Sequence, residues 1–234
     1  MAGFLTQRDI GIIVMDITTI FLCLGIIFQS KLIRENGGEA DHIFFRLLQI
    51  DILVAISEAV SYLGDEKTFP GAKACNLLGI TVFYIFFGMF SILWLRYTDV
   101  RFCNGESVFS KHRIAVATPM IIIWVLLIVN IFGKFIFWVD ENNVYHRGVL
   151  FIPMYVVFLI YLFTGFGMIF RYRRKTGRKN LVPVWLYIMP LVLVLVVPFV
   201  FGGVSMAAIG VVSGLVFTHI GSMNEQVAKS ISEG

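Results

Sequence analysis

Three acidic residues lie inside long apolar stretches of this chain: Asp16, Asp51 and Glu58. Asp51 and Glu58 are seven residues apart, so a helix places them on one face, with Ala55 between them. Acidic side chains at membrane depth are rare, and they usually face the interior of a helix bundle or a water-filled cavity. Two interpretations remain open. The residues form a ligand, ion or proton site, or they form a hydrogen-bonding seam that only orders the helices.

A second group of polar and aromatic residues lies in the segment 137–148 (FWVDENNVYHRG). Its two adjacent asparagines tolerate the left-handed backbone of a hairpin turn, so both flanks are expected to fold back over one end of the bundle. Because loops carry function disproportionately, this segment is a candidate lid that contacts a ligand. A rigid turn that only joins two helices is the alternative. The candidate ligand-binding residues of the segment are Trp138, Asp140, Asn143, Tyr145 and Arg147.

Gly210 and Gly214 form a G-x-x-x-G step in the last apolar stretch. Small residues at this spacing let two helix backbones approach closely inside a membrane. The step predicts a helix-packing contact, either within the chain or with a second copy of it.

The sequence contains none of the common signatures of catalysis. It has no H-E-x-x-H, G-x-S-x-G, Walker or glycine-rich dinucleotide motif, and none of its 4 His residues has a metal-ligand neighbour at helical spacing. We therefore expect no catalytic residue, no bound metal and no cofactor. The formal net charge of +4 requires no nucleic-acid partner.

Membrane-spanning helices must position these residues. The chain is 58% hydrophobic and only 15% charged, whereas soluble domains average about 25% charged residues. A helix needs about 20 apolar residues to cross a bilayer. We predict an all-α membrane protein, a bundle of seven transmembrane helices, with spans at 10–31, 43–64, 73–98, 113–138, 148–172, 181–201 and 203–222.

Lysine and arginine are distributed unevenly between the two ends of this predicted bundle. Most of them fall on one side, including the run at 171–179 (RYRRKTGRK). The positive-inside rule then places the N-terminus outside and the C-terminus in the cytoplasm. We expect residues 1–222 to form the transmembrane domain and residues 223–234 to begin a cytoplasmic helical connector.

The chain resembles the seven-helix N-terminal sensory region of bacterial signalling proteins from Firmicutes, whose C-terminal part is usually a GGDEF diguanylate cyclase. The resemblance rests on the segment 93–99 (LWLRYTD), on the loop 137–148 and on the basic stretch before residue 181. The segment 218–230 is similar to the connector that precedes the cyclase in that family. The sequence departs from the family because no cyclase motif follows. The chain is therefore either an excised membrane region or a protein without an output domain.

The resemblance implies a receptor in the bacterial cytoplasmic membrane. A small-molecule stimulus, extracellular or membrane-borne, would change the packing of the helices, and the last helix would pass that change to a cytoplasmic output domain. The expected partners are the lipid bilayer, the stimulus and a second copy of the chain, paired through the last helix and the connector. We expect the stimulus to bind in an outward-facing pocket near Asp16, Glu58, Tyr145 and Arg147.

Two other functions fit the sequence. A small ion-coupled transporter would use Asp51 and Glu58 as its coupling carboxylates. A structural membrane anchor would use the intramembrane polar residues only for packing.

Overall fold

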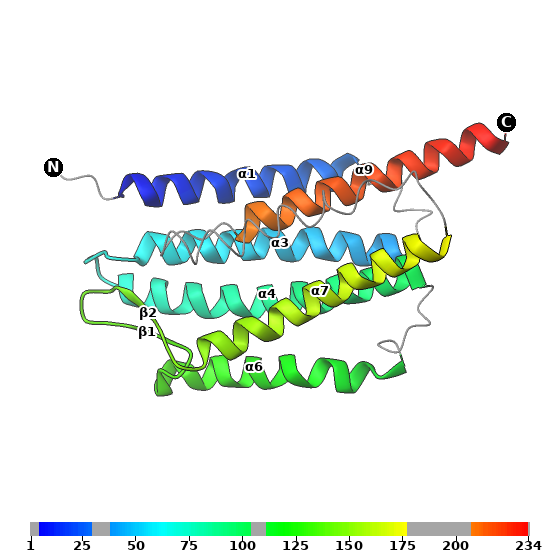
Figure 1. The fold of residues 1–234 in the computed structure, drawn as a ribbon. Helices are drawn as coiled ribbons and strands as arrows, with labels where there is room; N and C mark the ends of the chain where they lie inside the picture. The colour runs from blue at the N-terminus through cyan, green and yellow to red at the C-terminus, as the bar shows by residue number, and fades with distance from the viewer. Residues whose placement is uncertain (1–4, 30–37, 104–110, 177–206, 234) are drawn as a thin grey trace.

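The computed structural model describes residues 5–29, 38–103, 111–176 and 207–233. These residues form six α-helices and one short β-hairpin, which lie side by side in an elongated bundle (Figure 1). In chain order the elements are α1 (Gln7–Gln29), α3 (Glu39–Gly64), α4 (Ala72–Cys103), α6 (Arg113–Gly133), β1 (Phe137–Val139), β2 (Tyr145–Arg147), α7 (Phe151–Thr176) and α9 (Ala207–Glu233).

The prediction of seven transmembrane helices is wrong. Four described helices are long and apolar enough to cross a membrane: α1, α4, α6 and the Phe151–Arg171 part of α7. The run 43–64 does form α3, but its charged side chains, including Arg46, Asp51 and Glu58, make it too polar to count as a span. The apolar part of α9, Ala207–Gly221, is too short. The predicted span 181–201 lies outside the described residues. The chain is therefore a helical membrane protein, and its described residues contain four candidate spans.

The hairpin predicted for residues 137–148 is confirmed. The two strands pair antiparallel with Trp138 opposite His146, and Asn143 has the left-handed φ of 62° that the turn requires. The predicted helix 113–138 is therefore too long. Helix α6 ends at Gly133, where Lys134 takes a left-handed φ of 57° and its N–H donates to the carbonyl of Asn130.

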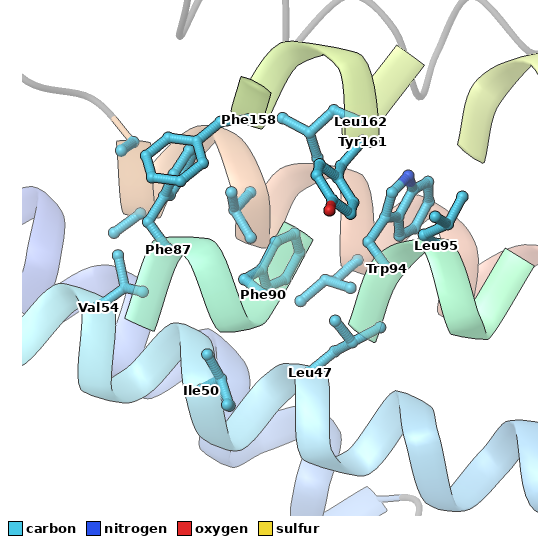
Figure 2. Packing of buried hydrophobic residues seen from close by; sticks show 14 of the residues in the cluster. Leu47, Ile50, Val54, Phe87, Phe90, Trp94, Leu95, Phe158, Tyr161 and Leu162 are labelled. Carbon is cyan, nitrogen blue, oxygen red and sulfur yellow. The ribbon is translucent and has the colours of Figure 1, made fainter. Parts of the chain in front are cut away.

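The apolar core lies mainly where α3, α4 and α7 meet. Figure 2 shows Leu47 and Val54 of α3 beneath Phe90 and Trp94 of α4, with Phe158 of α7 on the other side. All five of these side chains are buried. The outer surfaces of α1 and α6, by contrast, expose large apolar side chains such as those of Phe21, Phe28 and Ile128, as a lipid-facing surface would.

Helices α3 and α4 approach closely near the hairpin end of the bundle, which is the end that carries β1 and β2 (Figure 1). A Cβ atom added to Gly79 would lie 2.7 Å from the backbone nitrogen of Ser61 and 2.9 Å from its Cα. These are backbone atoms of α3, which cannot rotate away. Only glycine fits at this position.

We predict that Gly79→Val lowers the stability of the bundle, because the new side chain must push α3 and α4 apart. Overpacking of this kind typically costs about 1–3 kcal/mol. The thermal unfolding midpoint of the detergent-solubilised chain measures the loss. Gly25→Val is the matched control, since a Cβ added to Gly25 meets nothing within 4 Å. Equal midpoints for the two variants would contradict the close approach.

Candidate functional site

One face of α1 carries a polar stripe that packs into the bundle. The buried residues of this helix are Asp9, Ile12, Asp16, Thr19, Cys23 and Ile26. Their separations alternate between three and four, which is the spacing of a narrow helix–helix contact line. The stripe packs against α3, and we call this contact the α1–α3 seam.

Two pairs of side chains fix the register of the α1–α3 seam. The carboxyl group of Asp16 lies against that of Glu58, and the thiol of Cys23 donates to an Asp51 carboxyl oxygen at 3.6 Å. From the first pair to the second, α1 advances by seven residues while α3 goes back by seven, as two antiparallel helices require. Thr19, between the pairs on α1, therefore falls level with Ala55 on α3.

The α1–α3 seam holds three carboxyl groups almost completely away from solvent. Asp16 is 2% exposed, Asp51 is 0% exposed and Glu58 is 3% exposed. Among the described residues, no ion pair involves Asp16 or Asp51. Burying an ionised carboxylate costs several kcal/mol unless a positive charge or hydrogen bonds compensate. A carboxyl group in the seam is therefore stable only when it is protonated or when its charge is compensated.

Ion pairs occupy the hairpin end of the bundle instead. The ammonium group of Lys67 lies 2.8 Å from Asp9, and the Arg8 guanidinium lies 3.0 Å from Asp65. Asp9 also accepts from the Thr6 N–H, and its own N–H donates to the Thr6 hydroxyl, which caps the start of α1. These contacts tie the beginning of α1 to the turn between α3 and α4.

Asp65, in that turn, is partly buried. Burial raises the pKa of its carboxyl group, while the charge of Arg8 and a hydrogen bond from Asn76 act against the rise.

Asn143 of the hairpin turn is a structural residue. Its side-chain amide donates to the carbonyl oxygens of Gly64 and Lys67, and its own carbonyl accepts from the Asn76 amide at 3.0 Å and from the Glu66 N–H. Asn143 is 4% exposed. The hairpin is thus fastened onto the α3–α4 turn.

Two other candidate residues of the hairpin, Trp138 and Asp140, contact His146. Trp138 stacks on His146, and Asp140 lies 2.8 Å from the His146 ring. The hydrogen bond from His146, followed by the one from the Val144 N–H, lowers the pKa of Asp140. Asp140 therefore adds stability to the hairpin above its ordinary pKa, and this stability is lost as the pH falls through the lowered value.

Tyr145 and Arg147 reach toward the helices. The Tyr145 hydroxyl lies 3.3 Å from that of Tyr84 in α4, and the Arg147 guanidinium lies 4.8 Å from the centre of the Phe151 ring.

The structure therefore divides the predicted site residues into two groups. Asp16, Asp51 and Glu58 lie in the α1–α3 seam, whereas Trp138, Asp140, Asn143, Tyr145 and Arg147 belong to the hairpin and its contacts. The outward-facing pocket that would join the two groups stays a prediction. Of the two packing glycines, Gly210 is buried, and a Cβ added to Gly214 would meet no described atom within 4 Å. Their predicted role in helix packing also stays a prediction.

Sequence reasoning missed Thr19 and Cys23 in the seam, and it missed Asn76 beneath the hairpin. A signal for the first two was present, because they continue the alternating spacing of Asp9, Ile12 and Asp16. Nothing near Asn76 in the sequence marks it. Its three acceptors lie in Asp65 and Asn143, which only the folded chain brings to it.

Within the described residues, no three side chains of His, Cys, Asp or Glu converge as a metal site would require. No protein-family model, curated protein or solved structure matches this chain.

We predict that Asn143→Ala destabilises the hairpin end, because it removes the side-chain amide that donates to the Gly64 and Lys67 carbonyls and that tolerates the left-handed turn. A hydrogen bond of this kind contributes about 0.5–1.5 kcal/mol. The thermal unfolding midpoint checks this. The neighbouring Asn142, which is exposed, supplies the control Asn142→Ala. A similar drop in both variants would mean that the buried hydrogen bonds of Asn143 contribute little.

Proposed function

We propose that this chain is a membrane-embedded sensor module, in which a change of packing at the α1–α3 seam is carried out of the bundle by α9. The observation that supports this most strongly is the course of α9. The helix packs against both α1 and α3 and then continues past the end of the bundle opposite the hairpin (Figure 1). Any rearrangement of the α1–α3 seam would therefore act on α9, a helix that extends out of the bundle.

A series of contacts between aromatic rings joins α9 to α3, α4 and α7. The His219 ring of α9 stacks on Phe44 of α3 with ring centres 6.1 Å apart, and Phe44 contacts Tyr97 of α4 at 5.8 Å. Tyr97 stacks on Trp94, which contacts Phe166 of α7. Packed rings of this kind resist small independent shifts, so α9 is expected to move together with α3, α4 and α7.

The end from which α9 emerges also carries Arg96, Arg101 and Arg171 at the ends of α4 and α7. The positive-inside rule favours the cytoplasm for such an end. In this proposal α9 delivers its signal to a cytoplasmic output domain, and the resemblance to GGDEF-associated sensory regions makes a diguanylate cyclase the proposed output. A free-energy gap of a few kcal/mol between two packings is sufficient for the switch.

The sensor proposal predicts that neutralising the α1–α3 seam moves α9. The side-chain nitrogen (Nε2) of Gln29 in α1 lies 3.7 Å from the sulfur atom of Met223 in α9, at the end of the seam opposite the hairpin. We replace both with cysteine, with Cys75 and Cys103 changed to serine, and follow disulfide formation in membranes. We expect Glu58→Gln to change the cross-linking rate about fivefold or more, which corresponds to a coupling free energy of about 1 kcal/mol.

The control for this experiment is Glu141→Gln, which removes the same charge from an exposed position in the hairpin. It should leave the cross-linking rate unchanged. Equal rates in the parent, Glu58→Gln and Glu141→Gln would show that the seam and α9 are uncoupled, and the sensor proposal would then fail.

The burial of Asp51 and Glu58 favours a second function, an ion-coupled transporter, because intramembrane carboxyl groups mark ion and proton pathways. This alternative predicts ion flux in proteoliposomes that contain the purified chain, and it predicts that Glu58→Gln abolishes the flux. A sensor shows no flux in either protein. The two functions are thus separated by one assay of the unmodified chain.

A further inference from the structure

We infer that the imidazole of His219 is a proton-binding site, and that its protonation releases α9 from α1 and α3. The inference concerns how α9 is held in the bundle, so it holds whether or not α9 carries a signal. The end from which α9 emerges is the proposed cytoplasmic end, so the proton comes from the cytoplasm. That last statement alone rests on the proposed function.

His219 is the last buried residue of α9 among those whose side chains the structure describes. The buried residues Ala208, Val212 and Leu215 precede it at separations of four, three and four, which is the spacing of one helix face. The next residue, Ile220, is 44% exposed, and α9 then continues past the bundle (Figure 1). A titratable side chain therefore occupies the position at which the apolar contact line of α9 ends.

The imidazole ring of His219 lies flat against α3. Its plane is inclined by 10° to the Phe44 ring, and the ring centres are 6.1 Å apart. His219 is 9% exposed, and its Nε2 atom has no hydrogen-bond partner among the described residues. A neutral imidazole can leave one nitrogen as an unused acceptor, whereas an imidazolium carries an N–H on both nitrogens. Protonation would thus bury a charged donor without an acceptor, which is more costly than a neutral one.

The carboxyl groups on the helices around His219 do not compensate a charge on its ring. His219 takes part in no ion pair with a described residue. Residues 17–29 of α1 contain no acidic or basic side chain, and their titratable group is Cys23. The acidic residues of α3 and α4 on this side, with their partners, are Glu39 and Asp99 (both with Arg96), Asp41 (the Gly38 N–H) and Asp51 (the Cys23 thiol).

Positive charges gather at the end of the bundle where His219 lies. They belong to Arg96, Arg101 and Arg171, and exposed Arg46 and His42 lie on the same part of α3. A proton on His219 would therefore enter an apolar contact at an end that already carries like charges. The face of Phe44 attracts a cation, but a separation of 6.1 Å is at the outer limit of that attraction. The cost of burying the charge therefore exceeds what stacking returns.

Burial accordingly lowers the pKa of His219 below its ordinary value of about 6.5. When α9 leaves the bundle the imidazole meets water and binds a proton at its ordinary pKa, whereas the docked imidazole stays neutral. Docking of α9 is therefore strongest above the ordinary pKa, and it weakens as the pH falls from there through the lowered value. About ten of eleven exposed imidazoles are protonated at about pH 5.5, so the docking constant falls about tenfold from its value near pH 7.5.

Hydrogen exchange of the α9 amides measures this docking. The unmodified chain in lipid nanodiscs is labelled with deuterium at about pH 7.5 and at about pH 5.5, and each rate is corrected for the intrinsic exchange rate at that pH. We expect the protection of peptides that cover residues 215–224 to fall about tenfold at the lower pH. Peptides from residues 83–95 in the core of α4 supply the internal reference and should keep their protection.

Two variants remove the proton-binding group. His219→Phe keeps a ring against Phe44 and cannot bind a proton, so its protection should be the same at both pH values. His219→Gln is also uncharged at both, and it gives the same answer where His219→Phe does not fold. The matched control is His42→Phe, which removes an exposed histidine two residues from Phe44 and should show the tenfold fall of the parent.

The inference is overturned if the protection of α9 in the parent does not depend on pH. It is also overturned if His219→Phe and His219→Gln lose protection at low pH as the parent does, or if His42→Phe abolishes the dependence. None of these measurements alters the α1–α3 seam. An α9 that responds to pH but not to Glu58→Gln would retain the proton site while the sensor function fails, so the two proposals can be distinguished.

Discussion

The burial of three carboxyl groups in an apolar helix bundle is the constraint on which the rest of the structure depends. An ionised carboxylate loses several kcal/mol of hydration when it enters such a place, so Asp16, Asp51 and Glu58 cannot be positioned independently of one another. The antiparallel register of α1 and α3 satisfies this constraint by giving each carboxyl group a polar neighbour on the other helix. A shift of one residue in either helix would separate these neighbours.

At the hairpin end of the bundle, by contrast, buried charges are paired with opposite charges. These ion pairs hold together segments that are distant in the sequence. Lys67 binds Asp9 across the start of α1, and Asn143 fastens the hairpin to the α3–α4 turn. This end is therefore held together by hydrogen bonds and ion pairs, whereas the interior of the seam brings together three buried carboxyl groups. The packing of the seam is therefore sensitive to an added charge.

In the sensor proposal, helix α9 is the element that carries a change in the seam out of the bundle. It touches both helices of the seam, and its His219 ring joins the aromatic contacts that run through α3, α4 and α7. A change in the separation of α1 and α3 alters the surface on which α9 rests. Because α9 continues beyond the bundle, the sensor proposal has it carry a small displacement from inside the bundle to its far end.

The sequence by itself determined that the chain is a helical membrane protein, because apolar runs of spanning length depend only on local composition. It also determined the hairpin, since adjacent asparagines mark the left-handed turn at Asn143. It overestimated the number of spans, because helices such as α3 can be buried by their neighbours without being apolar throughout. The tertiary structure alone decided the pairing of Asp16 with Glu58, the pairing of Cys23 with Asp51 and the docking of Asn143 on Asn76. Each depends on the register between elements far apart in the chain, and residue types and spacing within one segment carry no information about that register.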